Sequence, residues 1–277
     1  MGYDTVIYEP GPVARVILDR PDKRNAQSWK LLDEMEQAFN EAVADQACRV
    51  IVLSGAGPSF SGGHDLDSPE QLADGRERNE GLDGFAHGEL LKDIYIDSHL
   101  RWRNLPKPTV AMVHGYCVYG GWMIAAAMDV IFAASDALLI PTYGDYFTTH
   151  WDVGARKAKE ILFENTFMTA EEAMRWGFVG RVYPSDELEA QTLKYAGRVA
   201  EHNPLTLRQI KYSINQSLDT MGFSTTVRSL YPDFYRRAAR QRAPEPDPRR
   251  TQGQFRSQVG RAMDYLREDG LSRPGQG

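Results

Sequence analysis

Two kinds of hydrophobic pattern follow one another along this chain. Short apolar runs, bounded by glycine, proline or polar residues, predict strands at residues 3–9, 13–19, 49–53, 110–113, 129–134, 138–140 and 178–183. Apolar residues at helical spacing predict helices at residues 25–44, 89–102, 122–128, 153–163, 185–201, 204–218 and 224–240. Short strands mixed with helices, without a regular strand–helix–strand repeat, indicate an α/β protein.

The segments between these elements are more irregular. Residues 68–88 are polar and acidic and predict a partly helical, mobile excursion, whereas residues 141–152 form an aromatic-rich loop. Thr169 and Glu172 have the spacing of a capping box for a further short helix. The proline-rich residues 243–248 predict a linker, followed by a polar tail with one helical candidate at residues 255–267 and a disordered end at 274–277. We therefore expect a core at residues 1–200, a C-terminal helical region at 201–242, and a linker and tail at 243–277.

Two glycine-bearing turns each follow a predicted strand. The first is Phe-Ser-Gly-Gly-His-Asp-Leu at residues 60–66, and the second is His-Gly-Tyr-Cys-Val-Tyr-Gly-Gly at residues 114–121, which opens a helix. Glycine lets the backbone come close to a ligand because it has no Cβ. A helix start also presents N–H groups that have no acceptor within the helix. Two such turns facing each other would form an oxyanion hole of two backbone N–H groups.

This pair of turns resembles the signature of the crotonase family, also called the enoyl-CoA hydratase/isomerase family. The first is similar to F-(S/C)-A-G-x-D-(L/I), with Gly62 at the usual alanine. The second is similar to N-G-x-x-x-G-G-G, with His114 in place of Asn and Tyr119 in place of the first glycine. The resemblance continues at residues 18–26 and 168–179, so it covers most of the chain to about residue 218. It implies a crotonase-type spiral of β-β-α units with a C-terminal helical trimerisation region, and thus a homotrimer or a homohexamer.

The resemblance also implies an acyl-CoA substrate whose thioester enolate is held by the N–H groups of His64 and Gly120. Coenzyme A would be part of the substrate, and no separate cofactor or metal is expected. The substrate-binding residues that we expect are Lys23, Arg24, Gly62, Gly63, Asp65, Gly121, Trp122, Met123 and His150.

Several of these residues have a structural alternative. Lys23 and Arg24 lie where family members contact the CoA nucleotide, but they could also form a solvated surface turn. Lys211 could meet a CoA phosphate from the same or a neighbouring subunit, or could simply be solvated. We favour a capping role for Asp65, a space-filling role for the His64 side chain and a structural hydrogen bond for His114. Trp122 and Met123 could line an acyl pocket or pack in the core.

The chain departs from the family at the acid–base positions. Hydratases of the family use two glutamates, and Met123 stands where the first is expected. No glutamate occurs between Glu89 and Glu160, so the second is absent as well. The loop at 141–152 offers other proton-transfer groups, of which Asp145 is our first choice, Tyr143 the second and His150 the third, with Asp152 also present. Each of these residues could instead hydrogen-bond locally within the loop.

Composition narrows the function classes further. The 277 residues are 42% hydrophobic and 25% charged, as in ordinary soluble proteins. The net charge of −6 disfavours nonspecific binding to nucleic acid or to an anionic membrane. Two cysteines, Cys48 and Cys117, indicate a reducing compartment, and no signal segment opens the chain, so we expect a cytoplasmic protein. No dinucleotide-binding, Walker or zinc-ligand spacing occurs.

The sequence therefore predicts an enzyme that acts on an acyl-CoA, a lyase or isomerase of the enoyl-CoA hydratase/isomerase family. The missing glutamates leave two alternatives open. One is a hydrolase of a CoA thioester or of a carbon–carbon bond, and the other is a non-catalytic homologue that binds acyl-CoA.

Overall fold

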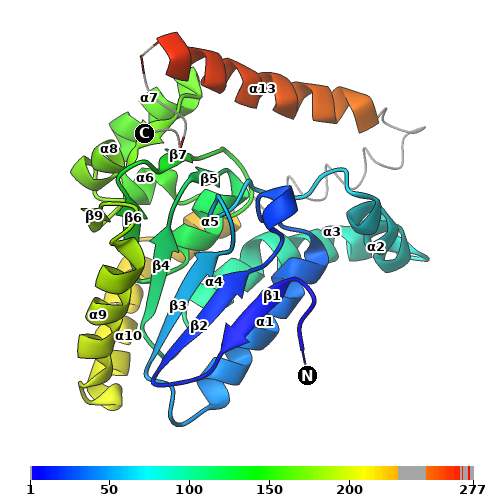
Figure 1. Cartoon of the computed structure of the whole chain (residues 1–277). Helices are drawn as coiled ribbons and strands as arrows, with labels where there is room; N and C mark the ends of the chain where they lie inside the picture. Colours follow the sequence, from blue (N-terminus) through cyan, green and yellow to red (C-terminus); the bar gives the residue numbers. More distant parts are fainter. Residues whose placement is uncertain (1, 230–247, 269, 271–273, 275–277) are drawn as a thin grey trace.

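Two β-sheets form the centre of the molecule (Figure 1). The computed structural model describes residues 2–229 and 248–268, with residues 270 and 274. The larger sheet has the order β1-β2-β3-β4-β6-β9, in which β1 and β2 are antiparallel and all other neighbours are parallel. Its strands are β1 (Val6–Glu9), β2 (Val13–Leu18), β3 (Val50–Gly55), β4 (Thr109–Val113), β6 (Val130–Ala134) and β9 (Arg181–Tyr183). The apolar runs of β3 and β4 are buried on both faces, as expected for parallel strands covered on both sides.

A smaller sheet carries the second glycine turn. It has the order β5-β7-β8, formed by β5 (Tyr116–Val118), β7 (Leu138–Ile140) and β8 (Met168–Thr169). The chain passes from β4 in the larger sheet to β5 in the smaller one through Gly115, where φ is 58°. A Cβ at Gly115 would lie 2.1 Å from the Pro58 carbonyl oxygen, so this crossing requires glycine.

Two long helices pack on the larger sheet. Helix α1 (Trp29–Ala44) packs against β1 and β2, and α9 (Leu188–Ala200) contacts β2, β3, β4, β6 and β9. The predicted start of the first helix at residue 25 is wrong. Ser28 is the N-cap and accepts the N–H of Leu31, while the Asn25 amide is used to bond Ala56 and Ser59 in a distant turn.

Most of the remaining helices match the predicted segments, but a one-turn helix at residues 149–152 lies inside the stretch predicted as a loop. The excursion at residues 68–88 contains two helices, and the capping box of Thr169 and Glu172 is confirmed. The predicted helix at residues 224–240 is present as far as Arg228, and the stretch from residue 230 lies outside the described residues. The other helical elements are η1 (Pro21–Lys23), α2 (Pro69–Asn79), α3 (Gly84–Lys92), η2 (Asp93–Asp97), α4 (Ser98–Arg103), α5 (Gly120–Ala126), α6 (Thr149–Asp152), α7 (Ala155–Glu164), α8 (Ala170–Arg175), α10 (Pro204–Thr220) and α11 (Phe223–Arg228).

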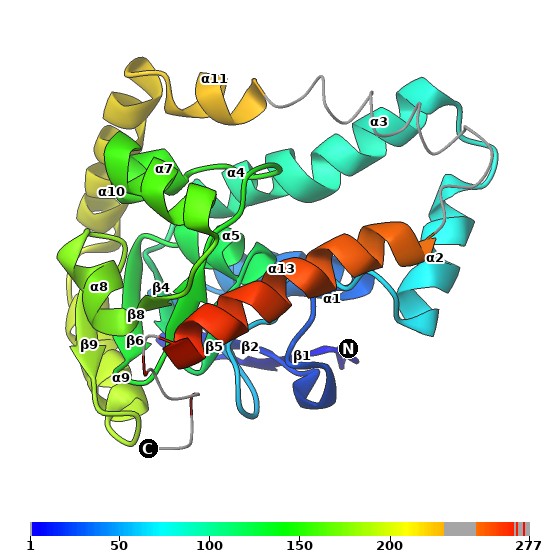
Figure 2. The ribbon, with the colours of Figure 1, turned by 90° about the horizontal axis from the view of Figure 1, so that it is seen from above.

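A C-terminal helix covers the smaller sheet. Helix α13 (Pro248–Glu268) is longer than the candidate predicted at residues 255–267. Its Ala262 and Leu266 pack with Val118, Tyr119 and further apolar residues of the smaller sheet. Figure 2 shows α13 crossing the molecule from the side that carries α2 toward β5. The predicted linker at residues 243–247 and the tail end at 275–277 lie outside the described residues. Among the described helices, none is both long and apolar enough to cross a membrane.

Candidate active site

The first glycine turn is held between Gln27 on one side and β5 on the other. The Gln27 N–H donates to the Gly63 carbonyl (2.8 Å), and the Gln27 carbonyl accepts the Asp65 N–H (2.9 Å). This pairing brackets His64, so the N–H and C=O of His64 face away from the Gln27 backbone. On the other side, Ser61 pairs with β5, because its N–H donates to Tyr116 and its carbonyl accepts the Val118 N–H, both at 3.0 Å.

The structure brings the two predicted turns into contact. Gly63 has φ of 93°, and a Cβ there would lie 2.9 Å from the Val118 carbonyl oxygen and 3.5 Å from the Gly120 nitrogen. Gly120 is the first residue of α5, so its N–H has no acceptor within that helix. A Cβ on Gly121 would lie 2.7 Å from the Ser61 carbonyl oxygen. Glycine at these positions therefore allows the backbones of the two turns to approach each other.

The His64 imidazole lies between the second turn and the loop that follows β7. A Cβ on Gly120 would lie 2.9 Å from His64 Cε1 and 3.0 Å from His64 Nδ1. The other ring nitrogen, Nε2, lies 3.7 Å from Asp145 Oδ2. The His64 and Asp145 side chains are only 13% and 14% exposed. The ring fills space, as predicted, and it also pairs with an acidic side chain.

Two further residues near His64 were not found from the sequence. The Tyr95 ring meets the His64 ring edge to face at 4.8 Å, and its hydroxyl accepts the Trp29 Nε1–H at 2.8 Å. His99, four residues on, is fully buried and stacks on Tyr146 at 5.1 Å. A spacing of four residues places Tyr95 and His99 on one face of a helix, and this spacing was the available signal.

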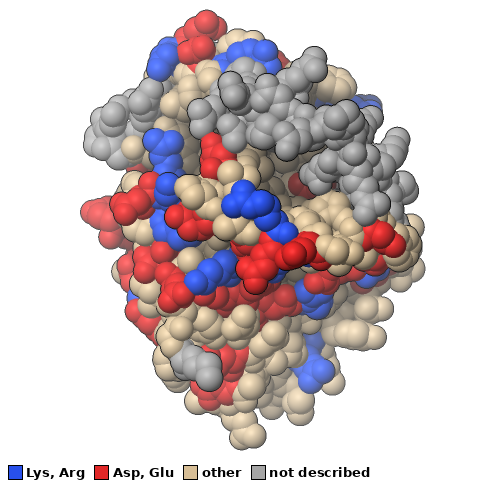
Figure 3. Space-filling view, turned by 90° about the vertical axis from the view of Figure 1, so that its right-hand side faces the viewer, with Lys and Arg blue, Asp and Glu red and all other residues tan. Residues whose placement is uncertain are grey.

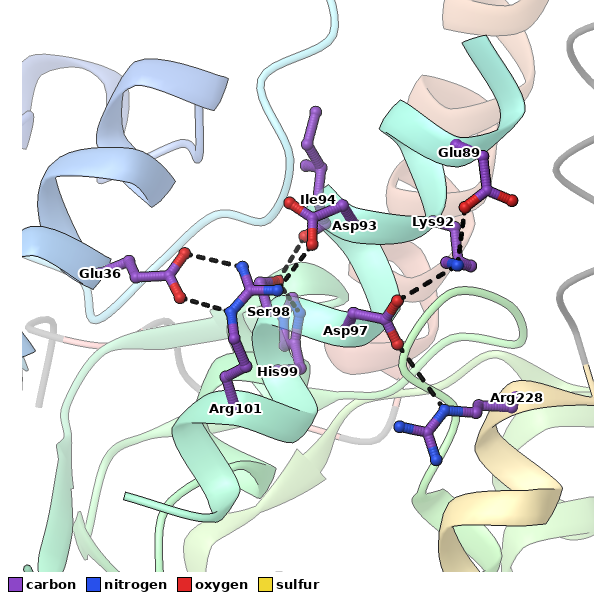
Figure 4. A network of polar contacts seen from close by, with 10 residues as sticks. All are labelled: Glu36, Glu89, Lys92, Asp93, Ile94, Asp97, Ser98, His99, Arg101 and Arg228. Atoms are coloured by element: carbon purple, nitrogen blue, oxygen red, sulfur yellow. Dashed lines mark hydrogen bonds and ion pairs between the residues drawn. The ribbon is translucent and has the colours of Figure 1, made fainter. Parts of the chain in front are cut away.

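The segment that carries Tyr95 and His99 includes a π-helical turn, η2, a feature often found at functional sites. Ion pairs hold the segment on its outer side (Figure 4): Arg101 bonds Glu36 and Asp93, while Asp97 pairs with Lys92 and Arg228. Burial lowers the pKa of His99 well below its ordinary value, so this imidazole is neutral. The Ser98 hydroxyl donates to the Ile94 carbonyl, so His99 Nδ1 donates to Ser98 Oγ.

Only some of the predicted acid–base groups in the loop at residues 141–152 lie beside His64. Tyr143 is 63% exposed and its ring packs on Phe147, so the structure does not bring it to His64. His150 packs on Phe147 and Trp151, and burial lowers its pKa. Of the predicted acid–base groups, Asp145 is thus the one that the described contacts place beside His64.

The half-buried Asp152 and the buried Trp122 form a separate pair. Asp152 Oδ2 accepts hydrogen bonds from Trp122 Nε1 (3.2 Å) and from the Thr148 hydroxyl (2.7 Å). Burial raises the pKa of the Asp152 carboxyl to about 7, even though these bonds act in the opposite direction. The Trp122 ring stacks on Phe178 at 3.5 Å, and Met123 is buried beside it in sequence. Trp122 therefore packs in the core, the alternative to its predicted place in an acyl pocket.

Three other candidate residues have structural roles. Asp65 pairs with Arg20 (2.8 Å) and accepts the Ser68 N–H ahead of α2. Burial acts to raise the Asp65 pKa, but the bonds from Ser68 and Arg20 prevail and hold it below its ordinary value. His114 Nε2 donates to the Gly57 carbonyl (2.9 Å), as predicted. Lys211 is 8% exposed and pairs with Asp129 directly before β6, and its contact with a CoA phosphate stays a prediction.

Two exposed cations lie beside the first turn. Lys23 and Arg24 are exposed, and the Arg24 carbonyl accepts the Gly62 N–H at 2.7 Å. Figure 3 shows acidic and basic side chains interspersed on the face that it presents. A phosphate near the first turn would therefore depend on local cations such as Lys23 and Arg24. Among the described residues, no group of three or more His, Cys, Asp or Glu side chains could hold a metal ion.

The two sheets, the paired glycine turns and the helical C-terminal region define a crotonase-type fold. The sequence model of the family described as "Enoyl-CoA hydratase/isomerase" matches residues 9–230. The chain belongs to this family.

Named relatives agree with this assignment. The candidate enoyl-CoA hydratase EchA13 of Mycobacterium tuberculosis (strain ATCC 25618 / H37Rv) is 37% identical over 247 residues, covering 81% of this chain and 76% of that protein. A crystal structure of a probable enoyl-CoA hydratase from Mycobacterium smegmatis is 38% identical with a TM-score of 0.75, covering 84% of this chain and 93% of that one. An enoyl-CoA hydratase/isomerase from Xanthobacter autotrophicus Py2 is 28% identical with a TM-score of 0.79, covering 95% and 99%.

Proposed function

We propose that this protein binds an acyl-CoA thioester and stabilises its enolate with the backbone N–H groups of His64 and Gly120. The observation that carries the proposal is the close approach of the two turns. A Cβ added to Gly63 would lie 3.5 Å from the Gly120 nitrogen. Donors held in this way need no reorganisation as negative charge develops on the thioester oxygen. Each such donor stabilises a transition state by about 2.7–4 kcal/mol.

The nucleotide end of CoA would meet Lys23 and Arg24. Both are exposed and adjoin the first turn through the bond between Arg24 and Gly62. An ammonium and a guanidinium are suitable partners for phosphate oxygens. Cytoplasmic location is proposed with this function, supported by Cys48 and Cys117, which are both free and buried.

The net reaction is a lyase or isomerase reaction on the enolate, but ordinary hydration by a glutamate pair is disfavoured. Met123 can neither deprotonate water nor protonate the α-carbon. A hydrolase of a CoA thioester or of a carbon–carbon bond is the second candidate. The contact of Asp145 with His64 favours either enzyme over a non-catalytic homologue, because it places two proton-transfer groups beside the turns.

The test of the shared step is α-proton exchange in D2O with a panel of saturated acyl-CoAs, followed by mass spectrometry. Enolate stabilisation predicts deuterium at the α-carbon of at least one member, and a raised melting temperature in its presence. A wild-type protein that neither exchanges nor is stabilised by any acyl-CoA, short or long, would contradict the proposal.

We also propose a homotrimer or a homohexamer. Helix α10 leaves several large apolar side chains exposed in the single chain, namely Leu205, Ile210, Tyr212 and Ile214. Burying such residues between subunits would be favourable. Sedimentation equilibrium at micromolar concentration should give a multiple of three chains, and a monomer would rule the assembly out.

A further inference from the structure

The position of the His64 ring assigns roles that the sequence left open. Building on the proposed function, we infer that the His64 imidazole transfers the α-proton of the acyl thioester, and that Asp145 is the residue that positions this ring. His64 would then act twice, through its backbone N–H on the oxyanion and through its side chain on the proton.

The tautomer of His64 follows from what faces each nitrogen. A carboxylate only accepts hydrogen bonds, so the nitrogen that faces Asp145, Nε2, carries the proton. Nδ1 is then left with its lone pair, on the edge of the ring that lies against Gly120. At 3.7 Å, Nε2 and Oδ2 are just beyond hydrogen-bond distance, and catalytic contacts of this kind often shorten when substrate binds.

Nδ1 lies where a base is needed. A Cβ added to Gly120 would lie 3.0 Å from His64 Nδ1. The Nδ1 lone pair is therefore next to the residue that supplies one oxyanion donor. A thioester oxygen bound to the Gly120 N–H would lie about 3 Å from that nitrogen. In the inferred complex the α-carbon, two bonds from this oxygen, lies on the side of Nδ1.

Asp145 is less well placed to take the proton itself. The atoms nearest to a Cβ built on Gly120 belong to Gln27 and His64, and Asp145 is not among them, whereas Asp145 lies 3.7 Å from His64 Nε2. Asp145 has φ of 51°, a left-handed conformation that aspartate tolerates better than most residues. An uncommon backbone conformation at a functional site is typical of a residue held there by its surroundings.

The His64 ring is also held in place by a residue of η2. The edge of Tyr95 packs against it, and the Tyr95 hydroxyl is held by Trp29. Among the residues that the structure describes, the titratable groups that face His64 include Asp145 from the loop after β7, Tyr95 from η2 and His99 from α4. His99 is neutral, and the Asp145 carboxylate next to the ring stabilises an imidazolium.

The step balances as a simple proton transfer. The Nδ1 lone pair forms a bond to the α-hydrogen, and the electrons of the broken C–H bond form the carbon–carbon double bond of the enolate. The carbonyl π electrons move to the oxygen held by the two N–H groups. The imidazolium then returns the proton, or a deuteron in D2O, to the carbon.

The test compares His64→Gln and Asp145→Asn with His202→Gln and Asp186→Asn, matched changes at exposed residues outside the site. Acyl-CoA binding is measured by calorimetry and α-proton exchange is followed from pH 4 to 9. Removing a general base lowers the rate of proton transfer by about 100- to 10,000-fold. The rate of α-proton exchange in His64→Gln should therefore fall by at least about 100-fold. Its affinity for acyl-CoA should stay within about threefold of wild type. Asp145→Asn should retain slow exchange. The acidic limb of its pH–rate profile should move to lower pH, because the pKa of the His64 imidazolium falls when the neighbouring carboxylate is removed. Both controls should behave as wild type.

A second variant keeps the inference testable if His64→Gln does not fold. In His64→Ala, added imidazole should restore part of the exchange. Exchange that persists in His64→Gln, or that is abolished in Asp145→Asn at every pH, would overturn the assignment while leaving the proposed function standing. Absence of binding and exchange in the wild type would instead remove the proposed function itself.

Discussion

The Tyr119 hydroxyl donates a hydrogen bond to the side-chain oxygen of Asn165 at 3.3 Å. Tyr119 directly precedes Gly120 and has φ of 48°, an uncommon conformation for a residue with a Cβ. The Asn165 amide in turn donates to the Gln258 carbonyl of α13 (3.3 Å). The second glycine turn is thus connected through two side chains to the C-terminal helix.

Asn165 can be tested with two substitutions. It has φ of 55° at the C-terminus of α7, a left-handed conformation that glycine adopts without cost. Asn165→Ala and Asn165→Gly both remove the bonds to Tyr119 and Gln258, but only alanine adds backbone strain. We expect Asn165→Ala to be less stable than Asn165→Gly by about 1 kcal/mol in urea unfolding. Equal stability of the two variants would show that the left-handed conformation is not retained.

Gly120 should not tolerate a side chain. A Cβ there would lie 2.6 Å from Gln27 Oε1 and 2.9 Å from His64 Cε1, so Gly120→Val must displace one or both side chains. We expect loss of acyl-CoA binding or of α-proton exchange. Gly197→Val is a matched control, since a Cβ at Gly197 meets nothing within 4 Å. Unchanged binding and exchange in Gly120→Val would contradict the proposed oxyanion hole.

Restoring a glutamate at Met123 should not create a hydratase. Met123 is buried, and no glutamate occurs between Glu89 and Glu160, so we expect a water held by the new carboxylate to lack a second partner. We expect very slow hydration of crotonyl-CoA in the wild type and no gain in Met123→Glu, with a loss of stability of about 1–3 kcal/mol. Met174→Glu, on the exposed face of α8, serves as the control. Brisk hydration by the wild type would show that another residue replaces the glutamate pair.

The Asp152 carboxyl should make stability depend on pH. Burial raises its pKa in the folded protein from 3.8 to about 7, so the folded state binds this proton more tightly than the unfolded state. The contribution of this proton to the free energy of unfolding is fully present below pH 4 and is lost as the pH rises toward 7. Asp152→Asn keeps an oxygen for Trp122 and Thr148 but does not titrate. The stability of Asp152→Asn relative to wild type should therefore increase between pH 5 and pH 8 in urea unfolding, and a constant difference would refute the raised pKa.

Local patterns in the sequence predicted most of the elements and the two turns. Runs such as residues 50–53 form strands because their side chains are apolar on both faces, and Thr169 begins a helix because its cap is complete within three residues. The family resemblance, which is confirmed, rests on the same short stretches. These features depend on neighbours in sequence, which can be recognised without a structure.

The tertiary structure decided what depends on residues far apart in the chain. Asn25 lies outside helix α1, with φ of 52°, and its amide bonds carbonyls 31 and 34 residues away. The loop at residues 141–152 contains several acid–base candidates, and only folding selected Asp145 by placing it against His64. Tyr95 approaches the same ring from a helix that the sequence did not connect with the site. Such contacts form because distant segments pack around a shared core, and no local pattern records which side chains will meet there.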